Sequence, residues 1–115
     1  MKIFGIGTDI INIKRMEKLL KSNNSNFKNR IFSKKEIMYC EKKNNPFSFY
    51  AKRFAAKEAL SKALGTGIRK GIIFKNIEIL NDNLGKPSIN LKGSTEIFLK
   101  KKTQDQKIFY TFISI

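Results

Sequence analysis

The chain has 115 residues and a strongly basic composition, with 24 Lys or Arg, 9 Asp or Glu, no His and a formal net charge of +15. The length predicts one domain, residues 1–115, with a single modest core, and the shortness of the apolar runs excludes a membrane-spanning helix. Without His, His-based catalytic triads and most zinc sites are excluded, so any metal should be bound through oxygen. The lone Cys40 excludes an internal disulfide, and with Asp9 interrupting any apolar signal segment it predicts a cytoplasmic protein.

The excess of positive charge has two interpretations. It could serve a polyanionic partner, such as a nucleic acid, an acidic protein or a phosphate-rich cofactor. It could equally be the solvated surface of a lysine-rich chain, and the charge alone leaves both interpretations open.

The first part of the chain is predicted to form a strand and a basic helix. Residues 2–7 have the composition of a short strand that ends in glycines. A helix is expected over 12–21, with Ile13, Met16 and Leu20 on its inward face, because these positions share one side at helical spacing. Its outward face carries four basic side chains, namely Lys14, Arg15, Lys18 and Lys21.

Two further helices are predicted in the middle of the chain. The Ser-x-x-Glu pattern over 33–36 is a capping box, which indicates a helix that runs to about residue 43. Asn45–Pro46 fits the N-cap and the first position of a longer helix over 46–64. Gly65 is the expected C-terminal cap of that helix.

The second half of the chain is predicted to be rich in β-structure. Isoleucines alternate with polar positions over 73–79, and a turn sequence over 81–85 leads into a second short strand over 88–91, which indicates a hairpin. A short helix is expected over 94–102, with an acidic first turn and a basic last turn. The apolar run over 108–115 predicts a final strand.

Two carboxylates are candidate ligands for a divalent metal. Glu58 lies in a helix among alanines with Lys62 four residues later, so both side chains should point the same way. Asp9 ends a glycine-containing turn in a distant segment. Two oxygen ligands and a neighbouring lysine suit a magnesium–phosphate site. The alternatives are an ordinary Glu58–Lys62 surface pair and an Asp9 that caps the following helix.

Three motifs follow one another along the chain: GIGTDI over 5–10, RFAAKEALSKALGTG over 53–67 and NDNLGKP over 81–87. Together they resemble the holo-acyl-carrier-protein synthases, a family of phosphopantetheinyl transferases, and their order and spacing match almost the whole chain. The resemblance implies an α+β fold with a small antiparallel sheet packed with helices, and a homotrimer with active sites between subunits. It also implies Mg²⁺-dependent transfer of 4′-phosphopantetheine from coenzyme A to a serine of apo-acyl carrier protein, which releases adenosine 3′,5′-bisphosphate.

The resemblance also implies the site residues. Asp9 and Glu58 would hold the magnesium ion, Lys62 would contact the pyrophosphate, and either Glu58 or a magnesium-bound water would take the serine proton. The residues implied in coenzyme A binding are Arg53, Ser61, Lys62, Gly65, Gly67, Asn81, Gly85, Lys86 and Pro87. Arg53 lies about 140° around the helix from Glu58, so the two should not serve the same ligand atoms within one subunit. The resemblance implies that Arg53 lies near the 3′-phosphate of coenzyme A, either in the same subunit or across the trimer interface. The basic helix would dock the acidic carrier protein through Lys14, Arg15, Lys18 and Lys21.

Each of these segments also has an interpretation without a ligand. Gly65–Gly67 could be only a helix stop, 81–87 only a hairpin turn, and the basic helix only a solvated face. The chain departs from the family in two respects. A histidine that is usual in the last strands is replaced by Phe109 or Ile115, and the chain stops at Ile115, where relatives continue for about one further strand.

Two other functions compete with the enzyme. One is an inactive relative that only binds a carrier protein, because the terminal strand is apparently missing. The other is a small nucleic-acid-binding domain, suggested by aromatic and basic residues that interleave: Phe47, Phe49, Tyr50, Lys52, Arg53 and Phe54. These aromatics are expected within a helix, and no RNA-binding strand motif or helix-turn-helix spacing accompanies them. The sequence therefore predicts no nucleic-acid partner and no membrane partner.

Overall fold

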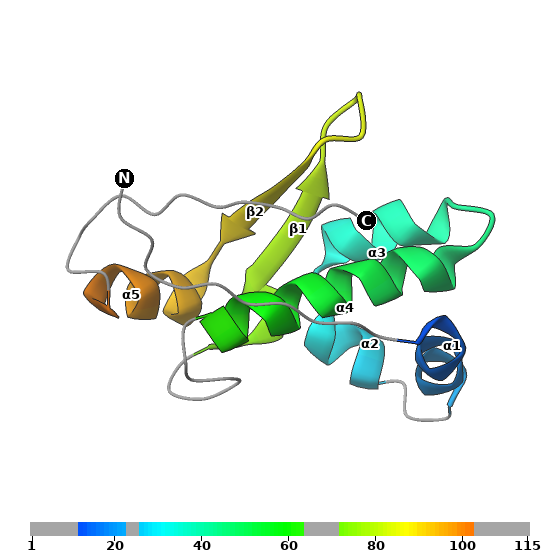
Figure 1. Cartoon of the computed structure of the whole chain (residues 1–115), viewed down its shortest axis with the longest axis horizontal. Helices are drawn as coiled ribbons and strands as arrows, with labels where there is room; N and C mark the ends of the chain where they lie inside the picture. Colours follow the sequence, from blue (N-terminus) through cyan, green and yellow to red (C-terminus); the bar gives the residue numbers. More distant parts are fainter. Residues whose placement is uncertain (1–11, 23–25, 64–71, 103–115) are drawn as a thin grey trace.

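The computed structural model describes residues 12–22, 26–63 and 72–102. In chain order these form α1 (Ile13–Lys21), α2 (Asn26–Ile31), α3 (Lys34–Glu41), α4 (Pro46–Ala63), the 3₁₀ turn η1 (Phe74–Asn76), β1 (Ile77–Asn81), β2 (Pro87–Leu91) and α5 (Gly93–Lys102) (Figure 1). Helices packed around a small antiparallel sheet confirm the predicted α+β class. Within these described ranges, no helix is long and apolar enough to cross a membrane. The strands predicted over 2–7 and 108–115 lie outside the described residues.

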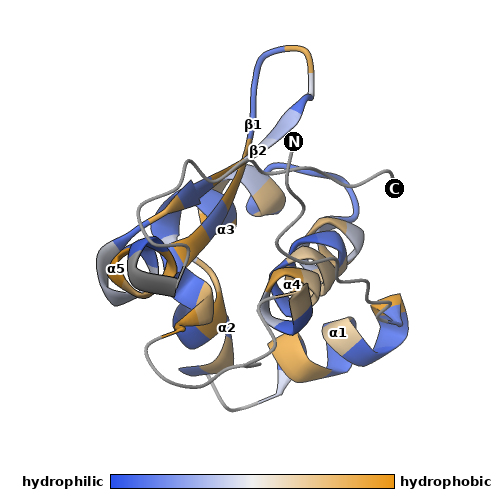
Figure 2. Ribbon diagram, turned by 60° about the vertical axis from the view of Figure 1, so that its left-hand side comes forward, coloured by the Kyte–Doolittle hydropathy of each residue, from blue (hydrophilic) through white to orange (hydrophobic). Residues whose placement is uncertain are grey.

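The long helix α4 runs through the middle of the described structure (Figure 1). Helix α1 packs against it on one side, while α3 contacts both α4 and strand β1, and α5 packs against η1. The two strands pair antiparallel, with Ile77 opposite Leu91 and Asn81 opposite Pro87. This register places Asn81 and Pro87 together at the turn end of the hairpin, which projects beyond the helices in Figure 2.

The apolar interior consists of two clusters of buried side chains. One surrounds the hairpin, with Phe74, Ile77 and Leu99 among its members, and the other lies among the helices around Met16 and Phe32. Two partly buried side chains, Ile31 and Phe54, pack against both clusters. Helix α4 therefore connects the sheet side of the core to the helical side, and its orientation fixes the positions of the functional residues that it carries.

The predicted capping box is confirmed at the start of α3. Ser33 Oγ accepts a hydrogen bond from the backbone N–H of Glu36 at 3.3 Å, and Glu36 Oε1 accepts one from the N–H of Ser33 at 2.9 Å. At α1 the cap is Asn12, whose side chain accepts from the N–H groups of Lys14 and Arg15 at 2.8 and 3.3 Å. The prediction that Asp9 could cap this helix is therefore wrong.

The hairpin turn is held by the side chain of Asp82. Its Oδ1 atom accepts hydrogen bonds from the N–H groups of Leu84 and Lys86 at 2.9 and 2.8 Å. Gly85 has φ of +85°, in the left-handed region that glycine adopts without a steric penalty. These local features explain why the hairpin was predictable from the sequence.

Several expectations about packing are wrong. Ile13 is 45% exposed, because α1 turns Met16 and the partly buried Leu20 toward α4 instead. Ile73 is 47% exposed and precedes η1, so the strand begins only at Ile77. Helix α2 was not predicted at all. Glu78, the polar residue between Ile77 and Ile79, is itself buried at 1% exposure.

Candidate active site

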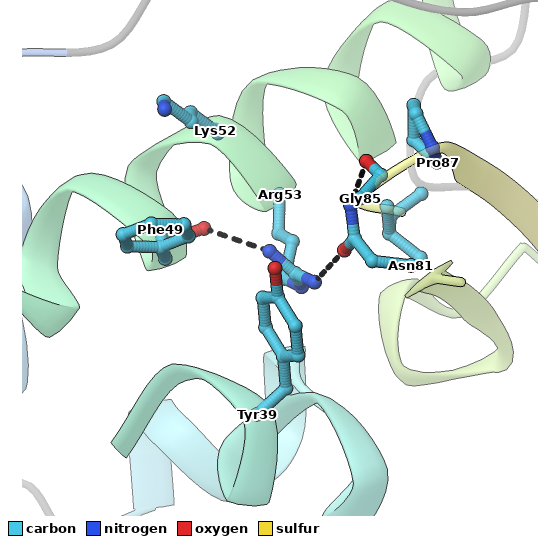
Figure 3. Close-up of a pocket in the computed structure, with 8 residues that line it drawn as sticks. Tyr39, Phe49, Lys52, Arg53, Asn81, Gly85 and Pro87 are labelled. Atoms are coloured by element: carbon cyan, nitrogen blue, oxygen red, sulfur yellow. Dashed lines mark hydrogen bonds between the residues drawn. The ribbon is translucent and has the colours of Figure 1, made fainter. Parts of the chain in front are cut away.

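A pocket of about 290 Å³ opens between α3, α4 and the hairpin (Figure 3). Its lining consists of Tyr39, Phe49, Lys52, Arg53, Ile79, Asn81, Gly85 and Pro87. Four of these residues, Arg53, Asn81, Gly85 and Pro87, were predicted to bind coenzyme A from the sequence motifs. The structure brings them together from two segments of chain, because the hairpin folds its turn end against α4.

Arg53 is the central charged group of the pocket and is only 4% exposed. Its Nη2 atom donates to Asn81 Oδ1, its Nη1 atom donates to the carbonyl of Phe49 at 3.5 Å, and its guanidinium carbon lies 4.4 Å from the centre of the Tyr39 ring (Figure 3). Asn81 in turn donates from Nδ2 to the carbonyl of Gly85 at 3.0 Å. A guanidinium held in this way suits the recognition of a phosphate or carboxylate.

The aromatic wall of the pocket was not predicted as part of the site. The rings of Tyr39 and Phe49 lie edge to face with 6.0 Å between centroids, and Lys52 Nζ lies 4.9 Å from the Phe49 ring. One signal in the sequence could have indicated Phe49, because it precedes Arg53 by four residues and shares its helix face. Tyr39 gave no such signal, since it reaches the pocket from a different helix.

Behind the pocket lies a buried charged network that sequence reasoning also missed. Lys57 Nζ donates to Glu36 Oε1 at 2.6 Å and to the carbonyls of Ile31 and Phe74 at 2.7 and 2.8 Å, and both Lys57 and Glu36 are 0% exposed. The three donors of an ammonium group are thus matched by three acceptors. Burial lowers the pKa of Lys57, and the attraction of Glu36 opposes that shift only in part. The network joins α2, α3 and α4 to the hairpin side of the core.

The second buried carboxylate, Glu78, is held from several elements. It accepts hydrogen bonds from Ser33 Oγ at 2.6 Å and Asn90 Nδ2 at 3.1 Å, and Lys92 Nζ lies 3.4 Å away. Burial raises the pKa of the Glu78 carboxyl, but these hydrogen bonds and the ammonium of Lys92 outweigh burial, so the pKa lies below its usual value. Glu78 is therefore a structural anion that fastens β1 to the start of α3.

The predicted catalytic residues lie further along α4 and do not line this pocket. Glu58 is partly buried, Lys62 is exposed, and Ser61 is fully buried with its hydroxyl donating to the carbonyl of Glu58 at 2.8 Å. The hydroxyl of Ser61 is thus engaged with the helix backbone. Lys86 is exposed in the hairpin turn. Asp9, Gly65 and Gly67 lie outside the described residues.

The carboxylate oxygens of Glu58 are the type of ligand that a hard cation such as Mg²⁺ prefers. The described parts of the chain contain no group of three or more His, Cys, Asp or Glu side chains that could hold a metal by themselves. The predicted pair of Asp9 and Glu58 stays a prediction, because one partner is not described.

The four basic residues predicted to dock a carrier protein are all exposed along α1. They are Lys14, Arg15, Lys18 and Lys21. Lys21 also forms an ion pair with Glu17 at 2.8 Å. By contrast, two of the aromatics that suggested nucleic-acid stacking pack into the core. Tyr50 is 1% exposed and its ring is tilted against that of Phe32, with 4.8 Å between centroids, and the partly buried Phe54 packs edge to face on Phe74. The nucleic-acid alternative is not favoured.

Comparison with known proteins identifies the family. The sequence pattern of the 4′-phosphopantetheinyl transferase superfamily matches residues 5–111. A holo-[acyl-carrier-protein] synthase of Pelagibacter ubique is 49% identical over 115 residues, which cover 100% of this chain and 88% of the relative. The crystal structure of the Neisseria meningitidis holo-[acyl-carrier-protein] synthase aligns with a TM-score of 0.80 and 41% identity, over 89% of this chain and 82% of that chain. The Bacillus anthracis synthase, solved in complex with CoA (3′,5′-ADP), aligns with a TM-score of 0.69 and 43% identity, over 79% and 77% of the two chains.

The match over nearly the whole chain and the shared fold define the class: the chain belongs to the 4′-phosphopantetheinyl transferase superfamily. Within that superfamily the resemblance to the holo-[acyl-carrier-protein] synthases is confirmed, and the protein is an enzyme of this type.

Proposed function

We propose that the protein transfers 4′-phosphopantetheine from coenzyme A to a serine of apo-acyl carrier protein, with release of adenosine 3′,5′-bisphosphate. The observation that carries this proposal is the pocket in which Arg53, Asn81, Gly85 and Pro87 meet. Its buried guanidinium and aromatic wall suit a nucleotide that carries phosphate groups. The relative from Bacillus anthracis, solved with CoA (3′,5′-ADP), supports this choice of ligand.

In this proposal the pocket holds the adenosine end of coenzyme A near its 3′-phosphate, and the chemistry takes place at Glu58 and Lys62. The hydroxyl oxygen of the carrier serine forms a bond to the β-phosphorus of the pyrophosphate. The bond from that phosphorus to the bridging oxygen breaks, and adenosine 3′,5′-bisphosphate leaves with the electron pair. The serine proton passes to Glu58 or to a water beside it. Lys62, one turn further along α4, contacts the pyrophosphate as a positive charge.

Asp9 and Glu58 would hold a magnesium ion, and a bound Mg²⁺ would neutralise charge on the pyrophosphate. The glycines Gly65 and Gly67 and the side chains of Ser61 and Lys86 complete the proposed coenzyme A contacts. Helix α1 would steer the acidic carrier protein through Lys14, Arg15, Lys18 and Lys21. We further propose a homotrimer, in which neighbouring subunits complete each active site.

The direct test is mass spectrometry of an apo-acyl carrier protein after incubation with the enzyme, coenzyme A and Mg²⁺. A gain of one phosphopantetheine group on the carrier is expected, and chelation of the metal should prevent it. Binding of the carrier without any mass gain would contradict the proposal and favour a relative that only binds carrier protein.

Glu58→Gln tests the catalytic assignment within the same assay. The variant keeps the shape of the side chain and removes its charge, so the transfer rate should fall by about a hundredfold or more. Glu96→Gln on α5 is the matched control, because that partly buried carboxylate pairs with Lys100 at 3.7 Å and lies on another helix. A rate for Glu58→Gln close to that of the control would refute the role of Glu58.

A further inference from the structure

Two cations of α4 face the same buried carboxylate. Lys57 and Arg53 are four residues apart and therefore lie on one face of the helix. Lys57 Nζ contacts Glu36 Oε1 at 2.6 Å, whereas Arg53 Nε lies 4.0 Å from Glu36 Oε2. All three side chains are at most 5% exposed. Glu36 is thus paired with Lys57, although Arg53 is close enough to compete for the carboxylate.

The hydrogen bonds around Glu36 show how this competition is resolved. Oε1 accepts from Lys57 and from the N–H of Ser33, and Oε2 accepts from the N–H of Ile79 at 3.2 Å. Arg53 Nε, in contrast, is buried without a hydrogen-bond partner among the described residues. A buried guanidinium beside a carboxylate would ordinarily form a bidentate pair with it. Here that pair is not made, and Nη2 of Arg53 points instead to Asn81 in the pocket (Figure 3).

The charge of Lys57 opposes a close pairing of Arg53 with Glu36. An uncompensated Glu36 would attract the guanidinium strongly, because Coulomb interactions are weakly screened in a buried environment. Lys57 cancels most of that attraction and also occupies one of the two oxygens. The ammonium is itself fixed by the carbonyls of Ile31 and Phe74, so it is not free to leave the carboxylate.

We infer that Lys57 is a positioning residue: by neutralising Glu36, it keeps the guanidinium of Arg53 turned into the pocket and available to a phosphate group of the nucleotide ligand. This inference rests on the proposed function, in which that pocket takes the adenosine end of coenzyme A. Lys57 does not touch the ligand. In a variant that lacks Lys57, the guanidinium of Arg53 pairs with Glu36, and the pocket loses its principal anion-binding group.

The test is calorimetric titration with adenosine 3′,5′-bisphosphate. Lys57→Met should weaken binding by about tenfold to a hundredfold, the equivalent of one charge-assisted hydrogen bond. The double variant Glu36→Gln/Lys57→Met removes the competing carboxylate as well, so affinity should return to within about threefold of wild type. Lys92→Met is the matched control, because Lys92 pairs with the other buried carboxylate, Glu78, at 3.4 Å, and its loss should leave binding unchanged.

A purely structural role for Lys57 gives a different pattern. In that case the double variant, which has lost both partners of the network, would bind no better than Lys57→Met, and this result would overturn the inference. Wild-type affinity in a folded Lys57→Met variant would overturn it too. If circular dichroism shows that Lys57→Met is unfolded, the single variant Glu36→Gln is measured instead. It must bind adenosine 3′,5′-bisphosphate at least as tightly as wild type does, and weaker binding refutes the inference. No binding by the wild-type protein would instead contradict the proposed function.

Discussion

The hydroxyl group of Ser33 serves two interactions at once, and its removal gives a stability change that can be worked out in advance. Ser33 Oγ accepts the capping hydrogen bond from the N–H of Glu36 and donates to Glu78 Oε2 at 2.6 Å, and the residue is 3% exposed. Loss of the cap costs about 0.5–2 kcal/mol, and loss of a hydrogen bond to a buried charged group costs about 1.5–3 kcal/mol. Asn90 and Lys92 still hold Glu78 in the variant. The expected destabilisation by Ser33→Ala is therefore about 2–4 kcal/mol.

The effect of Ser33→Ala should also depend on pH in a defined direction. The folded-state pKa of Glu78 is lowered, so its ionisation contributes stability above the unfolded-state value of 4.5, and that stability is lost as the pH falls through the folded-state pKa. Without the hydrogen bond from Ser33, the folded-state pKa of Glu78 rises toward its usual value. The variant therefore gains less stability from the ionisation of Glu78 and loses less in acid. The difference in the free energy of unfolding between wild type and variant should become smaller below about pH 4.5.

Urea unfolding followed by far-ultraviolet circular dichroism measures both effects. Wild type and variant are compared at one protein concentration, because association would make stability concentration-dependent. Ser48→Ala is the control: the Ser48 hydroxyl donates only to the carbonyl of Asn45 at 3.3 Å near the surface, and its loss should cost about 0.5 kcal/mol or less. The reasoning would be refuted if Ser33→Ala lowered the free energy of unfolding by less than about 1 kcal/mol at neutral pH. It would also be refuted if the decrease were as large in acid as at neutral pH.

Two further predictions concern the thiol and the basic helix. Burial raises the pKa of Cys40 to about 11, so the thiol of the folded protein should react very slowly with a disulfide reagent near pH 8, whereas the unfolded protein in urea should react at once. Because the folded-state pKa is the higher one, the free energy of unfolding should fall as the pH rises from 9.0 toward 11. Rapid labelling of the folded protein would contradict the burial of Cys40. Arg15→Glu and Lys18→Glu should raise the KM for acyl carrier protein without changing the affinity for coenzyme A, most strongly at low salt, because exposed charges act through screened steering. A carrier KM that is the same in the charge-reversed variants would show that the charge of α1 is only compositional.

Local signals made a large part of the fold predictable. The capping box of α3 joins residues three positions apart, and the start of α4 at Pro46 and the turn at Gly85 follow from the backbone preferences of proline and glycine. The hydrophobic spacing of α1 identified the helix but placed Ile13 inward, because spacing alone does not say how far the apolar stripe extends. Helix α2 escaped prediction, since a helix of six residues carries little periodicity.

The candidate site also has parts that local sequence predicted and parts that depend on contacts between distant segments. The motifs around Arg53 and Asn81 were evident in the chain, but their contact spans 28 positions and forms only when the hairpin folds against α4. The Lys57–Glu36 pair spans 21 positions and the Ser33–Glu78 hydrogen bond 45. The sequence by itself determined α1, α3, α4, α5, the hairpin turn and the family, because those depend on neighbouring residues and on motif order. Only the tertiary structure decided which charges are buried and which cation each carboxylate holds, because burial and pairing are properties of packed surfaces from distant segments.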